Sequence, residues 1–533
     1  MTPRSPRQQK ASQQPLDRAA KRMMAAVAVL IAVMLLLGSQ SLVQVRSFSW
    51  QGKSVSSDDV AFLLTFTRPV APESVEENLS IEPNLRGKFS WAGRRMAYTL
   101  EVPAAYGETY TLSLPAAASL LGKVGFDPFE ATFKTRDRVL AYIGTADEEK
   151  GRIVLFNLTE KKKTLLTPED QLVMDFKVYP NRDRILYSAV SKRDQDEGLL
   201  TATQIYTITT GLEVRAAPPA WQFWRSAQPT AGEIETILTN ANYQNLKFDL
   251  SPNGEVIVVQ RLSKENPADS GPWVVRQGEP PRKLETEPSG DFTIAPDSAS
   301  LLLQQGQGTA VIALDQTSSA DDANADNTNA NENDAGSEGT EDAEEQSDEL
   351  LDFLPDYGLT LDIANDGSAA ALVNFNQDNP DERFTQSLFL VSNRGKEKQL
   401  LQTSGSIVSA QFNEDNNILY CLINKLVEIE EEEFLAIPYL TAINTETGIE
   451  QKLLEMPPQS DITVALSPDG LAILFDEALA TEAQAIDESF SGPTHRLWLL
   501  PLFSTLEERL AGAPIPLPPT ELDTSGRNPK WLP

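Results

Sequence analysis

Two single residues are the first candidates for chemistry, because the chain has one histidine and one cysteine. His495 stands at the start of a strand-like run, so we expect a strand-edge or surface histidine rather than a catalytic one. Cys421 lies in the apolar run Ile-Leu-Tyr-Cys-Leu-Ile, which predicts a buried, unreactive thiol. A single histidine disfavours histidine-based metal sites and Ser-His-Asp catalysis, and a single cysteine excludes an internal disulfide. We therefore expect no metal, no cofactor and no enzymatic activity.

A second candidate is a group of aromatic residues that suits binding rather than catalysis. Trp221, Phe223 and Trp224 stand close together between Pro218-Pro219 and Pro229. Large aromatic side chains in a proline-bounded loop can anchor a protein interface. The alternative is that they pack this loop onto a neighbouring part of the chain. We take the three residues as the candidate binding site.

The charge of the chain limits its partners. The 533 residues carry 45 Lys+Arg against 77 Asp+Glu, a net charge of −32, which disfavours nucleic-acid binding. Residues 317–350 contain 12 acidic residues and no basic one, and they predict a disordered acidic insertion. This segment lacks the spacing of a calcium-binding loop.

The N-terminus predicts contact with a membrane. Residues 1–22 form a basic tail, and an apolar run begins at Met23. Residues 23–45 would be about 34 Å long as a helix, enough to cross a bilayer. The alternative is a signal peptide cleaved near Ser39-Gln40-Ser41. In both cases the bulk of the chain is exported, so we expect a single-pass membrane protein whose mass lies in the periplasm or on the cell surface.

Residues 47–135 alternate apolar and polar residues in short runs, which predicts a β-sandwich. The expected strands are 60–67, 87–91, 95–101, 109–114 and 130–135. The segment resembles the bacterial Ig-like domains of the SbsA type through Leu-Leu-Thr-Phe-Thr-Arg-Pro-Val (63–70), Leu-Ser-Ile-Glu-Pro (79–83) and Phe-Lys-Thr (133–135). The resemblance implies a spacer or adhesion module.

The rest of the chain repeats a turn. The clearest copies are Ser-Pro-Asn-Gly at 251–254 and Ser-Pro-Asp-Gly at 467–470. Degenerate copies begin near Pro180, Pro296, Asn365 and Asp415, and the last residues before Pro533 read as one more copy. Proline presets one corner of such a turn, Asp or Asn satisfies nearby backbone, and glycine supplies a positive φ. Apolar runs on both sides predict strand–turn–strand units of the kind that build propeller blades.

The repeat predicts an all-β protein in which an Ig-like β-sandwich is followed by a six- or seven-bladed β-propeller, with one N-terminal transmembrane helix. We expect residues 138–143 to pair with the C-terminal copy and close the ring. The turns resemble those of the TolB-like (PD40, WD-repeat-like) propellers across residues 138–533. In that family the propeller binds other proteins.

The preferred interpretation is a membrane-anchored extracytoplasmic scaffold whose propeller binds an envelope protein. An extracytoplasmic propeller enzyme of the lyase or lactonase type is the first alternative. A polysaccharide-binding envelope protein is the second.

Overall fold

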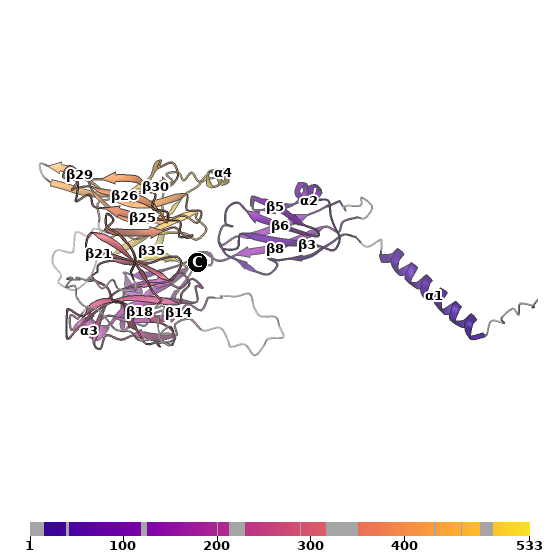
Figure 1. Ribbon diagram of the computed structural model, residues 1–533, viewed down its shortest axis with the longest axis horizontal. Helices are drawn as coiled ribbons and strands as arrows, with labels where there is room; N and C mark the ends of the chain where they lie inside the picture. Colours follow the sequence, from indigo (N-terminus) through magenta and orange to yellow (C-terminus); the bar gives the residue numbers. More distant parts are fainter. Residues whose placement is uncertain are drawn as a thin grey trace, which may run out of the picture. The chain divides into compact units, whose positions relative to one another are not determined.

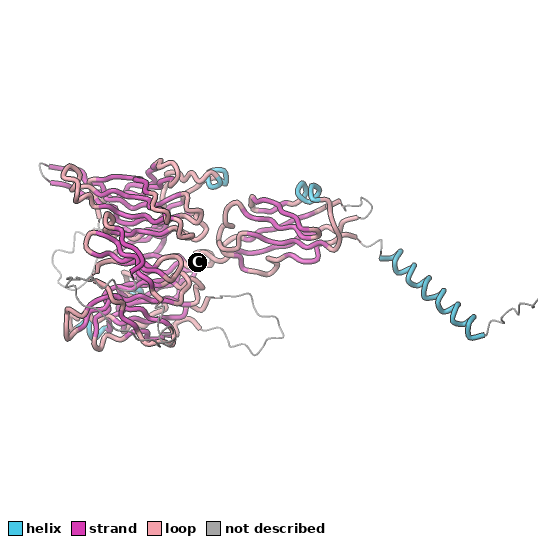
Figure 2. Tube along the Cα trace, viewed as in Figure 1, coloured by secondary structure: helices cyan, strands magenta, loops and turns pink. Residues whose placement is uncertain are grey.

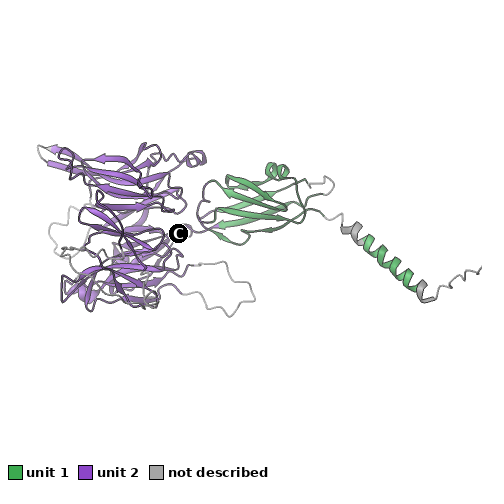
Figure 3. Cartoon of the chain, in the orientation of Figure 1, with its two compact units in different colours: residues 1–55, 59–101, 109–134 green, residues 56–58, 102–108, 135–533 purple. Residues whose placement is uncertain are grey.

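The structure is a computed structural model that describes residues 15–38, 42–118, 125–199, 201–212, 230–287, 289–315, 350–430, 433–459, 461–479 and 494–533. These residues fall into two compact units (Figure 3). The first unit contains residues 1–55, 59–101 and 109–134, and the second contains residues 56–58, 102–108 and 135–533. Strands dominate both units (Figure 2).

The N-terminal helix differs from the prediction. Helix α1 covers Pro15–Gly38, and strand β1 already begins at Val45 (Val45–Phe48). Val43 forms a β-bridge with Phe126, so the end of the predicted span at 23–45 belongs to the first unit's strand pairing. None of the helices among the described residues is long and apolar enough to cross a membrane. The helix predicted over 23–45 therefore ends at Gly38, because the pairing of Val43 with Phe126 takes the end of the predicted span into the first unit.

The first unit holds two four-stranded antiparallel sheets, in the strand orders β1-β3-β6-β5 and β2-β8-β7-β4. The remaining elements are β2 (Ser54–Val55), β3 (Ala61–Phe66), α2 (Pro72–Asn78), β4 (Ser80–Glu82), β5 (Gly87–Ala92), β6 (Arg95–Leu100), β7 (Thr109–Leu114) and β8 (Phe129–Thr135).

Aromatic rings fill the space between these two sheets. Phe48 of one sheet contacts Phe133 of the other with ring centroids 6.0 Å apart, and Trp50 contacts Phe133 at 5.0 Å. Five predicted strands are present within one or two residues of their expected bounds. The sandwich is therefore observed, whereas its Ig-like family stays a prediction.

The second unit is a ring of four-stranded antiparallel sheets, or blades (Figure 1). Within the described residues there are seven, numbered here in chain order. Blades 2 to 4 contain β12 (Gln171–Val178), β13 (Arg184–Ser191), β14 (Gln204–Thr209) and β15 (Ile234–Leu238); β16 (Tyr243–Leu250), β17 (Val256–Ser263), β18 (Ser270–Arg276) and β19 (Arg282–Lys283); and β20 (Phe292–Ile294), β21 (Ser300–Gln305), β22 (Gly308–Ala313) and β23 (Leu350–Leu354).

Blades 5 to 7 follow the same plan. They contain β24 (Leu359–Ile363), β25 (Ala369–Asn374), β26 (Gln386–Ser392) and β27 (Glu397–Thr403); β28 (Ser406–Phe412), β29 (Ile418–Glu430), β30 (Glu433–Asn444) and β31 (Glu450–Glu455); and β32 (Val464–Leu466), β33 (Ala472–Ala478), β34 (His495–Pro501) and β35 (Thr520–Trp531). The short helices of this unit are η1 (Asp147–Glu149), α3 (Lys192–Asp196) and α4 (Leu506–Leu510).

Strand β35 closes the ring. Its first half pairs with β34 of blade 7, up to Ser525 opposite Arg496. Its second half pairs with β9 (Val139–Gly144), from Gly526 opposite Gly144 to Trp531 opposite Leu140. Blade 1 is thus completed by β9, β10 (Ile153–Asn157) and β11 (Lys162–Leu165). This pairing confirms that the two ends of the propeller close the ring. Of the two predicted blade numbers, six and seven, the described residues form seven.

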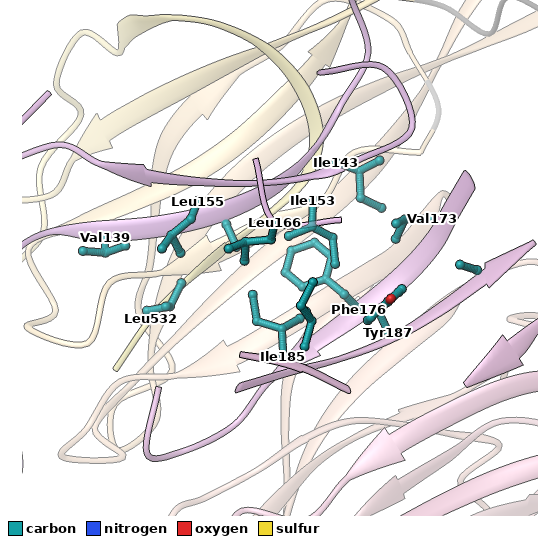
Figure 4. Packing of buried hydrophobic residues seen from close by; sticks show 13 residues of the cluster. Val139, Ile143, Ile153, Leu155, Leu166, Val173, Phe176, Ile185, Tyr187 and Leu532 are labelled. Carbon is teal, nitrogen blue, oxygen red and sulfur yellow. The ribbon is translucent and has the colours of Figure 1, made fainter. Parts of the chain in front are cut away.

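Apolar side chains fill the interface between blades 1 and 2. Figure 4 shows this cluster, in which residues of blade 1 such as Val139 and Ile153 pack against Phe176, Ile185 and others of blade 2. Leu532, just beyond β35, is fully buried in the same cluster. The C-terminal residues therefore contribute side chains as well as strand pairing to the first blade.

The repeated turns take the predicted form. The amides of Gly254 and Gly470 each donate to the carbonyl three residues earlier, at 2.8 Å, and both glycines have positive φ. Ser251 and Ser467 accept hydrogen bonds from the first amide of the returning strand. The turns therefore fix the distance between the first two strands of each blade.

Candidate functional site

The first strand of each blade lines up with the first strand of the next around the ring, and we call these the inner strands. They are the second half of β35, β12, β16, β20, β24, β28 and β32. Each repeated turn has a proline or, in two blades, Asn365 or Glu414 in its place. The residue three positions before it is equivalent in all blades, and we call it the inner-ring position. In blade order this inner-ring position holds Lys530, Lys177, Asp249, Thr293, Asp362, Gln411 and Ala465.

Acceptors at the inner-ring position bridge neighbouring blades. The carboxylate of Asp249 accepts from the Ile294 amide at 3.0 Å, and that of Asp362 accepts from the Phe412 amide at 2.7 Å. Gln411 accepts in the same way from the next inner strand. β-Bulges in β12, β16, β24 and β28 come shortly before these residues, and a bulge re-aims the side chains that follow it.

A pocket of about 390 Å³ lies where blades 1, 2 and 7 meet, and we call it the seam pocket. Its walls combine an apolar part with polar side chains brought from seven separate segments. The apolar lining includes Ile143, Leu172 and Met174, and the polar lining includes Lys150, Gln195, Asp461, Thr463, Asp476, His495, Arg527 and Asn528. Such a volume and such a mixed lining are typical of ligand sites.

Asp476 and His495 lie side by side in this pocket without a hydrogen bond between them. Asp476, on β33, is buried and accepts from the amides of Thr463 at 2.6 Å and Asn528 at 3.0 Å. His495 Nδ1 lies 3.7 Å from its carboxylate, beyond hydrogen-bond distance, and has no partner among the described residues. Burial raises the pKa of Asp476 and lowers the pKa of His495, which favours the neutral form of each group.

The structure corrects part of the expectation for His495. The residue does begin a strand, β34, as predicted, but it is only 7 % exposed and lines a pocket, so it is not a surface histidine. Its environment comes from three blades that are far apart in the sequence, which is why a reading of its neighbours alone missed it. Cys421 is buried, as predicted, and burial raises the pKa of its thiol.

Other predicted features cannot be compared with the structure. Trp221, Phe223 and Trp224 lie outside the described residues, and so does the acidic insertion except for Leu350, which begins β23. Within the described ranges there is no group of three or more His, Cys, Asp or Glu side chains arranged to hold a metal ion.

Comparison with known proteins gave similarities of fold only. No family model matches the sequence, and neither does any curated protein. Similar solved structures include TolB from Acinetobacter baumannii, with 8 % identity, a TM-score of 0.37, and coverage of 86 % of this chain and 83 % of that one. A protein from Bacteroides fragilis, proposed to be a 6-phosphogluconolactonase, has 11 % identity, a TM-score of 0.41, and coverage of 74 % and 98 %. An oligogalacturonate lyase in complex with manganese has 10 % identity, a TM-score of 0.31, and coverage of 82 % and 94 %.

One expectation is corrected by these comparisons. We expected the protein not to be an enzyme, but the similar structures include an oligogalacturonate lyase and the proposed lactonase. That exclusion is wrong, because it relied on the scarcity of histidine, and the single histidine present lies beside a buried carboxylate in a pocket. At such low identity the similarities extend to the propeller fold and not to a function.

Proposed function

We propose that this protein is a binding platform, in which the propeller recognises a protein partner of the cell envelope through the seam pocket. The observation that carries the proposal is the buried Nδ1 of His495, which has no hydrogen-bond partner among the described residues and lies in the pocket beside Asp476. A buried polar atom without a hydrogen bond is costly, and a partner that supplies the bond removes that cost.

The lining indicates what the partner presents. Leu172 and Met174 offer an apolar surface, and the Arg527 guanidinium and the Asp461 carboxylate offer charges of both signs. About 390 Å³ holds one or two inserted side chains rather than a whole domain. The partner would therefore place a polar-tipped side chain or a chain end in the pocket and spread over the surrounding blade surface.

Site-directed photocrosslinking in intact cells tests this proposal. Gln195 lines the pocket from α3, whereas Arg193 of the same helix has an 85 % exposed side chain and is not part of the lining. A photoreactive residue at 195 should give a discrete crosslinked protein, and the same residue at 193 should give much less. The crosslink at 195 should also fall in His495→Ala, whose folding is checked by thermal unfolding. Equal crosslinking at the two positions, or a crosslink unaffected by His495→Ala, would refute the proposal.

A second candidate function is enzymatic, and the Asp476–His495 pair favours it. A carboxyl whose pKa is raised by burial, beside an imidazole whose pKa is lowered by burial, is an arrangement suited to general acid–base catalysis in a pocket. The full chain should then turn over sugar lactones or uronate oligomers. The rate should fall at least about a hundredfold in Asp476→Asn and in His495→Gln. Turnover that both variants retain would assign the activity to a contaminant or to another site.

We also propose that the N-terminal segment attaches the chain to a membrane, with the propeller outside the cytoplasm. The described side chains of α1 leave Met23 and Met24 more than 70 % exposed, and a basic segment precedes them. Fractionation of the full chain should place it with membranes, and a chain lacking residues 1–41 should lose that association. Equal distribution of the two chains would contradict this.

A further inference from the structure

Lysines occupy the inner-ring position in two neighbouring blades. Lys530 of blade 1 and Lys177 of blade 2 take the place that Asp249, Asp362 and Gln411 fill elsewhere. Those three side chains accept hydrogen bonds from the next inner strand, and an ammonium group cannot accept one. The two lysines therefore do not repeat the bridging role of the position, in a chain whose net charge is −32.

The positive charge of Lys530 has less compensation from neighbouring groups than that of Lys177. Within the described residues its ammonium has neither a hydrogen bond nor an ion pair, whereas the Lys177 ammonium pairs with Asp249 at 2.8 Å. Burial and the positive charge of Lys177 together lower the pKa of Lys530 to about 8, against the opposing effect of nearby carboxylates. Lys530 and Lys177 hold equivalent positions of β35 and β12, two strands that contact each other, so their positive charges repel.

The carboxylates near Lys530 already have donors of their own. Asp249 pairs with Lys177, Asp175 accepts from Asn528 Nδ2 at 2.7 Å, and Asp476 accepts from the Asn528 amide. These three carboxylates lower the positive electrostatic potential around the two lysines, but none of them contacts the Lys530 ammonium. Lys177 keeps 35 % of its side chain exposed, so solvent, and with it a small ion, reaches this part of the inner ring.

We infer that Lys530 and Lys177 form an oxyanion site on the inner ring, which binds a carboxylate or phosphate group between their ammonium groups. A shared oxyanion converts the repulsion of two cations into two charge-assisted hydrogen bonds. Equivalent positions of successive blades place one ammonium on each side of the seam between blades 1 and 2. The inference does not depend on the proposed partner, because it needs only the propeller itself.

Thermal unfolding of the full chain with added anions tests the inference. At constant ionic strength, inorganic phosphate or acetate should raise the Tm saturably in the wild type. Lys530→Met should weaken this binding by about tenfold or more, because one charge-assisted hydrogen bond is lost. Lys425→Met, which removes an exposed lysine from β29, should leave it unchanged. A response to phosphate alone assigns the site to phosphate groups, and a response to acetate as well assigns it to carboxylates.

A second measurement covers the case in which Lys530→Met or Lys177→Met alters folding. An amine-reactive reagent at pH 8 should label Lys530 of the wild type, and mass spectrometry should show that the effective anion slows this labelling but not that of Lys425. Absence of a saturable Tm shift with both anions would overturn the inference. So would an unchanged shift in Lys530→Met, or labelling of Lys530 that neither anion slows.

Discussion

Single carboxylates of the inner strands link neighbouring blades by hydrogen bonds, but burying their negative charge lowers the stability of the fold. Asp362 accepts from the Phe412 amide of the next blade at 2.7 Å, yet burial raises the pKa of this carboxyl to about 6. Its normal value in an unfolded chain is about 3.9. Between these two values the folded protein binds the proton and the unfolded chain does not, so stability falls as the pH rises from about 4 to about 6.

Replacing Asp362 with asparagine should remove this pH dependence while keeping an acceptor for the Phe412 amide. We expect Asp362→Asn and the wild type to be similarly stable near pH 4. Above pH 6 the variant should be more stable, by about 1 to 2 kcal/mol. Urea unfolding at pH 4.5 and pH 7 measures the difference, and Asp378→Asn, at an exposed position, is the control. A gain that is equal at both pH values would contradict the expectation.

The turns show how one element tolerates different sequences. The residue after the Asp or Asn corner has a positive φ in six blades, and it is glycine only at Gly254, Gly367 and Gly470. In the other three blades Arg182, Ser298 and Asn416 take this strained conformation. Ser298 accepts from the Asn253 amide of the preceding blade, and Asn416 accepts in the same way from that of Asn365. In two of these three blades a hydrogen bond between turns thus accompanies the loss of glycine.

Two glycines of the same motif provide a matched test of turn packing. A Cβ at Gly254 would lie 3.0 Å from the Pro180 ring of the preceding blade, whereas a Cβ at Gly470 would meet nothing within 4 Å. Both alanine variants suffer the strain of a positive φ, about 1 kcal/mol. We expect Gly254→Ala to lose about 1 kcal/mol more than Gly470→Ala in chemical denaturation. Equal losses would mean that the Pro180 contact adds nothing.

The elements were largely predictable, because their signals are local. Alternating apolar residues indicate strands and Pro-Asn-Gly corners indicate turns, and each signal lies within a few residues of the element that it specifies. The closing strand was predicted because the last repeat is incomplete. The N-terminal error has the same origin. Leu42, Val43 and Val45 are apolar and follow the helical run closely, and only distant partners, such as Phe126 for Val43, show that this stretch belongs to the first unit's sheets.

At the scale of the whole molecule, ring closure depends on a few C-terminal side chains. Leu532 is fully buried between blades 1 and 2, so Leu532→Ala should lower the free energy of unfolding by about 2 to 5 kcal/mol. Leu351→Ala, at a 59 % exposed position on β23, should change it by less than about 1 kcal/mol. Chemical denaturation followed by tryptophan fluorescence gives both values. Similar losses for the two variants would show that the C-terminus is not a structural part of blade 1.

The seam pocket was beyond prediction, because it is a product of closure. Asp476, His495 and Asn528 come from blade 7 and its continuation, whereas Leu172 comes from blade 2, and only the closed ring brings them together. One signal was available in the repeat itself. A polar residue stands three positions before the turn in six of the seven blades, and aligning the copies at that position would have picked out Lys177, Asp362 and Lys530.

The joining of the two ends of the propeller by β35 also sets the order in which it can assemble during synthesis. Among the strands of the propeller, β9, β10 and β11 leave the ribosome first, but the strand that completes their sheet is made last. Until then the nascent chain carries an unpaired edge at β9, which is open to pairing with other chains. Production of this protein should therefore be sensitive to ribosome stalling near the 3′ end of its message, and holdase chaperones that shield exposed strands should matter most in that interval.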